Sequence, residues 1–161
     1  QRFSQYIGAK HSIAVNSCTA ALHLSLHVSG VGPGDEVIVP NFTMISTALS
    51  VCYTGAIPVF VEADPKTWNI DVDKIEEKIT DKTKAILVVH IFGNPCDMNA
   101  VNEIAQKYDL RTIEDAAEAH GAEYKGIKAG ALSDIAAFSF YANKNLTTGE
   151  GGMVVTQNQE L

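Results

Sequence analysis

Two kinds of hydrophobic pattern alternate along the chain. Continuous apolar runs predict buried strands at 13–15, 36–39, 57–61, 85–89, 110–113, 135–138 and 153–155. Apolar residues at helical spacing predict helices at 3–7, 20–28, 43–53, 71–79 and 98–108. Such alternation is typical of an α/β fold, so we expect a three-layer α/β/α arrangement around a mainly parallel, mixed sheet. Residues 121–128 predict a small hairpin that turns at Lys125 and Gly126.

Residues whose side chains or amides could bind a ligand or take part in catalysis follow several of these strands. Residues 17–19, His90 and Asp115 each come after a predicted strand, and Lys144 lies in the polar, glycine-rich loop 139–152 after another. Ligands of such sheets bind at the carboxyl ends of the strands, so we expect these groups to converge. Taken alone, Lys144 is better explained as a solvated surface charge. For His90, a packing or hydrogen-bonding role and a substrate contact are both open.

The start of the second helix is a candidate anion site. Ser17 is the expected N-cap, and the amides that follow it point out of the helix end. An ordinary capped helix is the alternative. The glycines at 30–34 do not form a dinucleotide-binding motif, because they end a helix and precede a strand, which is the reverse of the required order.

Composition and charge exclude several classes of binding partner and site. The 161 residues are 46% hydrophobic, which supports one domain, and the net charge is −7 without a Lys/Arg cluster. This charge argues against nucleic acid or an anionic membrane as a partner. The three cysteines are widely spaced, so neither a disulfide framework nor a metal site is expected, and a reducing cytoplasm fits best. Because the chain lacks an initial methionine and stops just after a strand, we expect it to be part of a longer protein.

One cofactor requires the three kinds of group that these strand ends offer. Pyridoxal phosphate (PLP) needs an amine for a Schiff base, a carboxylate on its pyridine nitrogen and a cradle for its phosphate. Lys144, Asp115 and the helix start at 17–19 match these needs. Glu114 is the competing carboxylate, and alternation along a strand lets only one of the two face the ligand.

Four motifs in order resemble a known family. Residues 16–22, 32–40, 113–121 and 139–152 resemble the DegT/DnrJ/StrS sugar aminotransferases, within the fold-type I PLP enzymes. The resemblance covers essentially the whole chain. The run 114–122, with Asn143, Lys144 and 147–152, looks most like the GDP-perosamine synthase branch of that family.

The resemblance implies a role for each matching residue. Lys144 would be the Schiff-base lysine, and Asp115 would pair with the pyridine nitrogen. Cys18 and Thr19 would bind the phosphate through their backbone N–H groups, and Ser139 would add its hydroxyl.

Two matching positions depart from the family pattern. Met44 stands where the family usually has an aromatic residue that stacks on the pyridine ring, and Phe42 is a candidate to compensate. Glu118 matches the position, often glutamine, that contacts the phenolic oxygen of the cofactor, where a carboxylate creates a like-charge contact unless a proton is shared. His120 is expected to pack beneath the cofactor without a proton role.

The resemblance implies transfer of an amino group, with glutamate as donor, to a nucleotide-linked 4-keto-6-deoxy sugar. Residues 1–161 would be part of the large domain, without an N-terminal segment and a C-terminal small domain, and a homodimer would complete the active site. One alternative is a PLP-dependent sugar dehydratase of the same family, which has histidine in place of the lysine. The other is a PLP-binding module without catalysis.

Overall fold

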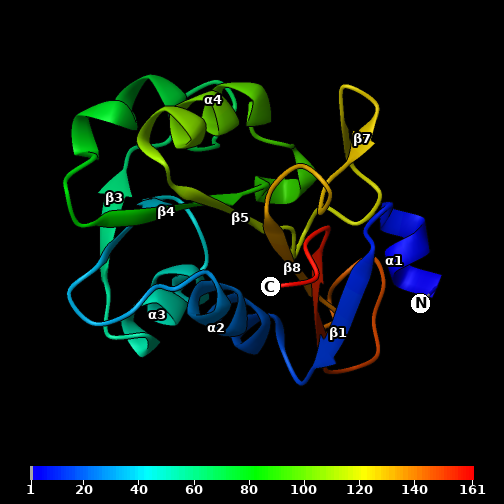
Figure 1. The fold of residues 1–161 in the computed structure, drawn as a ribbon. Helices are drawn as coiled ribbons and strands as arrows, with labels where there is room; N and C mark the ends of the chain where they lie inside the picture. Colours follow the sequence, from blue (N-terminus) through cyan, green and yellow to red (C-terminus); the bar gives the residue numbers. More distant parts are fainter. Residues whose placement is uncertain (1) are drawn as a thin grey trace.

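A seven-stranded sheet runs through the centre of the computed structural model, which describes residues 2–161 (Figure 1). Its strands are β1 (His11–Val15), β2 (Glu36–Pro40), β3 (Ile57–Val61), β4 (Thr83–Val89), β5 (Arg111–Asp115), β8 (Ile135–Ser139) and β9 (Gly152–Thr156). They are ordered β1-β9-β8-β5-β4-β2-β3. The pairs from β3 to β8 are parallel, and β9 is antiparallel to both of its neighbours. The predicted mixed, mainly parallel sheet is confirmed. Gln1, the first residue of the predicted domain, lies outside the described residues.

Helices cover both faces of this sheet. In Figure 1, α2 (Cys18–Val28) and α3 (Ile45–Tyr53) lie on one face, and α4 (Met98–Tyr108) lies on the other. The short α1 (Arg2–Ile7) packs near β1. Within the described part of the chain, every helix is too short or too polar to cross a membrane.

The central strand β4 shows why both faces must be covered. Ala85, Leu87 and Val89 belong to the core beneath α2 and α3, whereas Ile86 and Val88 pack on the α4 side. Alternating side chains point to opposite faces, so a strand that is apolar at every position needs a helix layer on each side. Full burial of each large aliphatic side chain stabilises the fold by roughly 1.5–3 kcal/mol.

A third cluster of apolar residues closes the edge near α1. The fully buried Phe138 packs edge-on against Phe3, with ring centroids 5.0 Å apart. Beside this cluster, β6 (Glu123–Tyr124) and β7 (Ile127–Lys128) form the predicted hairpin. Its turn residues Lys125 and Gly126 both have positive φ angles, of 51° and 83°, which confirms the expected turn.

Two predicted helices differ from the structure. Residues 71–79 form two 3-10 turns, η1 (Val72–Lys74) and η2 (Glu76–Lys78), instead of one amphipathic helix. The Asp71 side chain accepts a hydrogen bond from the Asp73 amide, and the amides of Lys74 and Ile75 bond to carbonyls three residues earlier, which is the 3-10 pattern. The helix predicted at 43–53 begins at Ile45, with Met44 as its N-cap.

Gly152 allows the closest backbone contact between the sheet and α2. A Cβ at this position would overlap the carbonyl group of Ser17 and crowd the Cys18 amide. Both neighbours are backbone atoms and cannot rotate away. Glycine is therefore required where β9 passes the start of α2.

We predict that Gly152→Ala lowers the free energy of unfolding by about 1–3 kcal/mol, because the added methyl forces β9 and α2 apart. Urea denaturation followed by circular dichroism measures the change. Gly32→Ala is the matched control, since a Cβ there meets no atom within 4 Å and the backbone is not left-handed. Equal stability of the two variants would contradict the packing argument.

Candidate active site

One cavity of about 340 Å³ lies where the carboxyl ends of the parallel strands meet the start of α2. Its volume is in the range of small-molecule sites. All seven residues that the sequence assigns to a site line it: Cys18, Thr19, Met44, Asp115, Glu118, Ser139 and Lys144. The predicted convergence is confirmed for residues 17–19, Asp115 and Lys144, but His90, also expected to converge with them, does not line the cavity. The individual roles stay predictions.

Asp115 ends β5 and is buried at the floor of this cavity. Its Oδ2 accepts a hydrogen bond of 3.0 Å from the Thr47 hydroxyl, and its Oδ1 accepts one of 3.2 Å from the Ala117 amide. The Cys18 thiol lies 3.9 Å from Oδ1. Burial raises the pKa of the Asp115 carboxyl, and the two stronger hydrogen bonds offset part of that rise.

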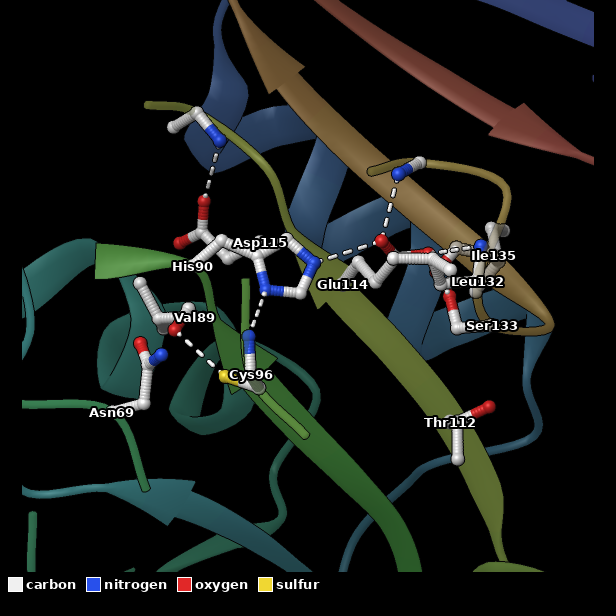
Figure 2. A network of polar contacts seen from close by, with 12 residues as sticks. Asn69, Val89, His90, Cys96, Thr112, Glu114, Asp115, Leu132, Ser133 and Ile135 are labelled. Atoms are coloured by element: carbon white, nitrogen blue, oxygen red, sulfur yellow. Dashed lines mark hydrogen bonds and ion pairs between the residues drawn. The ribbon is translucent and has the colours of Figure 1, made fainter. Parts of the chain in front are cut away.

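The competing carboxylate, Glu114, points to the other face of the sheet. Figure 2 shows the two neighbouring side chains directed apart, with Asp115 on the α2 and α3 side. Glu114 instead contacts His90 and the segment 130–133. Strand alternation therefore separates the two groups, as the sequence predicts.

Lys144 reaches the cavity from the loop between β8 and β9. Its Nζ lies 3.5 Å from Oε1 of Glu118, and both side chains are mostly buried. The other oxygen of Glu118 accepts a 2.8 Å hydrogen bond from the Phe92 amide. The loop is held in place where Thr147 and Thr148 both donate to the Phe140 carbonyl. The amine therefore has a defined position next to a carboxylate.

The start of α2 has the geometry expected of an anion site. Ser17 is the N-cap, with an extended backbone, and its hydroxyl oxygen accepts the Ala20 amide at 3.1 Å. The amides of Cys18 and Thr19 have no carbonyl one turn earlier in the helix, so they can bind an anion. Ser139 lies across the same cavity. Burial, followed by the charge of Asp115, raises the pKa of the Cys18 thiol well above its usual value, so this group is a neutral thiol.

Met44 lies at the rim and is 66% exposed. Phe42 does not compensate for the missing aromatic ring there, because its ring packs on Trp68 and Phe92 and is not part of the cavity wall. The side chain at this part of the rim is therefore a flexible thioether instead of an aromatic ring.

His90 and His120, the two histidines considered from the sequence, both pack within the protein instead of lining the cavity. His90 is fully buried and hydrogen-bonded to Glu114, which favours the hydrogen-bonding role over substrate contact. His120 packs among Phe3, Phe138 and Phe140 and does not line the cavity. Burial, with a smaller contribution from Lys144, lowers the pKa of His120 and favours its neutral form.

Thr47 is the functional residue that the sequence does not reveal. It is fully buried on the first turns of α3, and Thr43 lies 2.8 Å from its hydroxyl. The polar pair Thr43 and Thr47 at helical spacing, just after a strand, is the signal that could have indicated it.

We predict that Asp115→Asn stabilises the cofactor-free protein. The folded state holds a proton on Asp115 more tightly than the unfolded state, so the free energy of unfolding falls as the pH rises from about 4 through the raised pKa. The amide cannot ionise, and we expect a gain on the order of 1 kcal/mol at neutral pH. Urea denaturation at several pH values measures it.

Asp73→Asn controls for the change in net charge, because Asp73 is exposed. A loss of stability in Asp115→Asn at neutral pH, relative to this control, would contradict the desolvation argument.

The residues present fit PLP. Asp115 is a buried carboxylate without an ion-pair partner among residues 2–161, and a protonated pyridine nitrogen would supply that partner. The α2 amides suit a phosphate, and Lys144 supplies the amine. Within the same residues, no cluster of His, Cys, Asp or Glu side chains could hold a metal ion.

Known proteins resemble this chain along its whole length. It is 55% identical over 159 residues to a GDP-perosamine synthase of Caulobacter vibrioides, covering 99% of this chain and 43% of that protein. It is 49% identical over 160 residues to the dTDP-3-amino-3,4,6-trideoxy-alpha-D-glucose transaminase of Streptomyces venezuelae, covering 99% and 42%.

Among solved structures, the PLP-form of Spr1654 from Streptococcus pneumoniae has a TM-score of 0.94 and 37% identity, covering 99% of this chain and 45% of that chain. The chain thus spans less than half of the length of these relatives. The family model for DegT/DnrJ/EryC1/StrS aminotransferases matches residues 1–161. This chain therefore belongs to the DegT/DnrJ/EryC1/StrS aminotransferase family.

Proposed function

We propose that this chain carries the cofactor site of an aminotransferase that transfers an amino group from glutamate to a nucleotide-linked 4-keto-6-deoxy sugar. Family membership indicates PLP as the cofactor. The observation that carries the proposal is the convergence of Lys144, the buried Asp115 and the start of α2 on one cavity.

Each group has a defined task in this proposal. PLP, when bound, withdraws electrons from the carbon that bears the amine. Asp115 keeps a proton on the pyridine nitrogen, which maintains that withdrawal. The amides of Cys18 and Thr19 and the Ser139 hydroxyl bind the phosphate. Lys144 anchors the cofactor covalently and, once released, takes and returns a proton as base and acid.

The names of the relatives support a nucleotide sugar as the substrate class. One relative is named for a GDP-linked product and another for a dTDP-linked one, so the nucleotide varies within the family. The rival dehydratase has histidine at the lysine position, and Lys144 argues against it here. A binding module without catalysis has no need for an amine placed at the cavity wall.

We also propose that these residues are part of the large domain of a longer chain. The relatives are more than twice as long as the matched region, which supports this reading. Selectivity for the sugar would then depend on segments outside residues 1–161. The experiments below therefore use the complete chain.

We predict that Lys144→Ala lowers turnover by about a thousandfold or more, because the residue is both anchor and proton carrier. In the unaltered protein, borohydride reduction in the presence of PLP should attach the cofactor to Lys144, as located by peptide mass spectrometry. The variant should still bind PLP, but without the covalent link.

Lys125→Ala, in the exposed turn between β6 and β7, is the matched lysine control and should retain full turnover. Retained activity in Lys144→Ala, or labelling at another lysine, would overturn the assignment.

We further propose that the protein is a homodimer. Ile45, Leu49 and Tyr53 recur every four residues on α3 and are 69%, 37% and 56% exposed. Ile57 and Phe60 add exposed apolar surface on the edge strand β3, against which α3 packs. Exposed apolar side chains gathered along one helix in this way are typical of an interface.

We predict that light scattering coupled to size exclusion gives twice the mass of one chain, and that Leu49→Glu shifts the mass toward one chain by burying a charge at the interface. Ile127→Glu, on the exposed hairpin, should leave the mass unchanged. A wild-type protein that is monomeric at micromolar concentration would contradict the proposal.

A further inference from the structure

A second buried carboxylate lies directly behind the cofactor site and has no part in the chemistry described above. The side chains of Glu114 and His90 are both 0% exposed. Four donor groups lie within hydrogen-bond distance of the Glu114 carboxylate, although the Ser133 hydroxyl also lies 2.9 Å from the Ile135 carbonyl and has one proton for the two acceptors. The donors are His90 Nε2 at 2.8 Å, the Gly130 amide at 2.7 Å, the Leu132 amide at 3.0 Å and the Ser133 hydroxyl at 2.7 Å (Figure 2).

The neighbours of His90 define which of its nitrogens carries the proton. The Cys96 amide donates to Nδ1 at 3.2 Å, so Nδ1 is an acceptor and bears no hydrogen. Nε2 must then carry the proton and donate it to Glu114. The Cys96 thiol donates a hydrogen bond of 3.1 Å to the Val89 carbonyl. Burial lowers the pKa of His90, but its contacts with Cys96 and Glu114 outweigh burial and raise that pKa to about 10. A second proton on Nδ1 would nonetheless point at the donating Cys96 amide, so the geometry describes a neutral imidazole that donates to the Glu114 carboxylate.

This pair connects three segments that build the cofactor site. His90 follows β4, and its amide donates to the Asp115 carbonyl at 3.2 Å. Glu114 precedes Asp115 on β5, and its carboxylate holds the segment 130–133 that enters β8. Strand β8 ends at Ser139 and leads to the Lys144 loop. One carboxylate thus ties the Asp115 side of the site to the Lys144 side.

Stability alone does not account for a charge at this position. Much of the same face of the sheet is covered by apolar residues such as Ile86, Val88 and Val101. Replacing a buried polar pair with apolar groups of similar volume is often neutral or stabilising. The polar pair adds positional specificity, because each of its hydrogen bonds fixes the position of one backbone group or side chain.

We propose that Glu114 and His90 are positioning residues of the cofactor site: the carboxylate, with the neutral imidazole, fixes the strand end that presents Asp115 and the segment that leads to Lys144. The inference rests on the proposed function. Neither residue touches the cavity, so both act through the backbone that they hold.

Glu114→Gln is the most direct test in the complete chain. The new amide group would face donors at a site that needs an acceptor, so at least one bond is lost and the strand end is free to shift. We expect PLP affinity, measured by fluorescence titration, to fall about tenfold or more.

Val101→Ala is the control for stability, because it opens a small cavity in the same core without touching the network. We expect its PLP affinity to stay within about twofold of the wild type, even if its melting temperature falls as far as that of Glu114→Gln. Equal PLP affinity of wild type and Glu114→Gln, or equal losses in the two variants, would overturn the positioning role.

His90 variants test the neutral imidazole and remain informative if Glu114→Gln does not fold. The amide of His90→Gln can both donate to Glu114 and accept from Cys96, so it should retain PLP affinity within about threefold, whereas His90→Leu should lose about tenfold. Equal affinities of the two variants would overturn the proposal.

Nitrogen NMR of the cofactor-free protein measures the tautomer of His90 directly, and this measurement does not depend on whether the protein can bind PLP. A proton on Nε2 alone is expected, and a proton on Nδ1 would overturn the inference. If borohydride attaches no PLP to Lys144 in the wild-type protein, the proposed function is contradicted. The NMR result would still show whether His90 is a neutral imidazole with its proton on Nε2.

Discussion

The desolvated carboxylate of Asp115 is the constraint on which the rest of the site depends. Burial makes its charged form costly, and the neutral donors Thr47 and Ala117 offset only part of that cost. A cationic ring nitrogen placed at the carboxylate would offset the remainder. The cofactor-free protein is therefore less stable than it could be, and a cationic group bound at Asp115 would reduce this desolvation cost. Sites that bind a charged group tightly commonly have this character.

Two carboxylates can occupy neighbouring positions only because a strand separates them. Asp115 faces α2 and α3, where it meets the cavity, and Glu114 faces the opposite layer, where four donors surround it. Alternation along β4 gives that strand an apolar surface on each face of the sheet. At the end of β5, the same alternation places one carboxylate on each face. A shift of one residue along β5 would exchange the two groups and place the wrong carboxylate in the cavity.

Local patterns predict much of this fold because they are strong where burial is complete. The helix at 98–108 and the core of β4 are read correctly from apolar spacing alone. The segment 71–79 is misread, because apolar spacing cannot distinguish an α-helix from two successive 3-10 turns, the first of them capped by Asp71. Convergence of Asp115 and Lys144 follows from the rule for parallel strand ends. The contact between His90 and Glu114 does not, since it depends on the register between β4 and β5.

Glu118 shows how the structure answers a question that the sequence raises. A carboxylate beside a phenolic oxygen is unfavourable if both are charged. Here one oxygen of Glu118 is held by the Phe92 amide and the other faces the amine of Lys144. Phe92 has a positive φ of 52°, a costly conformation for this residue type that directs its amide toward the carboxylate. In the cofactor-free protein, the Phe92 amide and the Lys144 amine therefore both stabilise the Glu118 carboxylate.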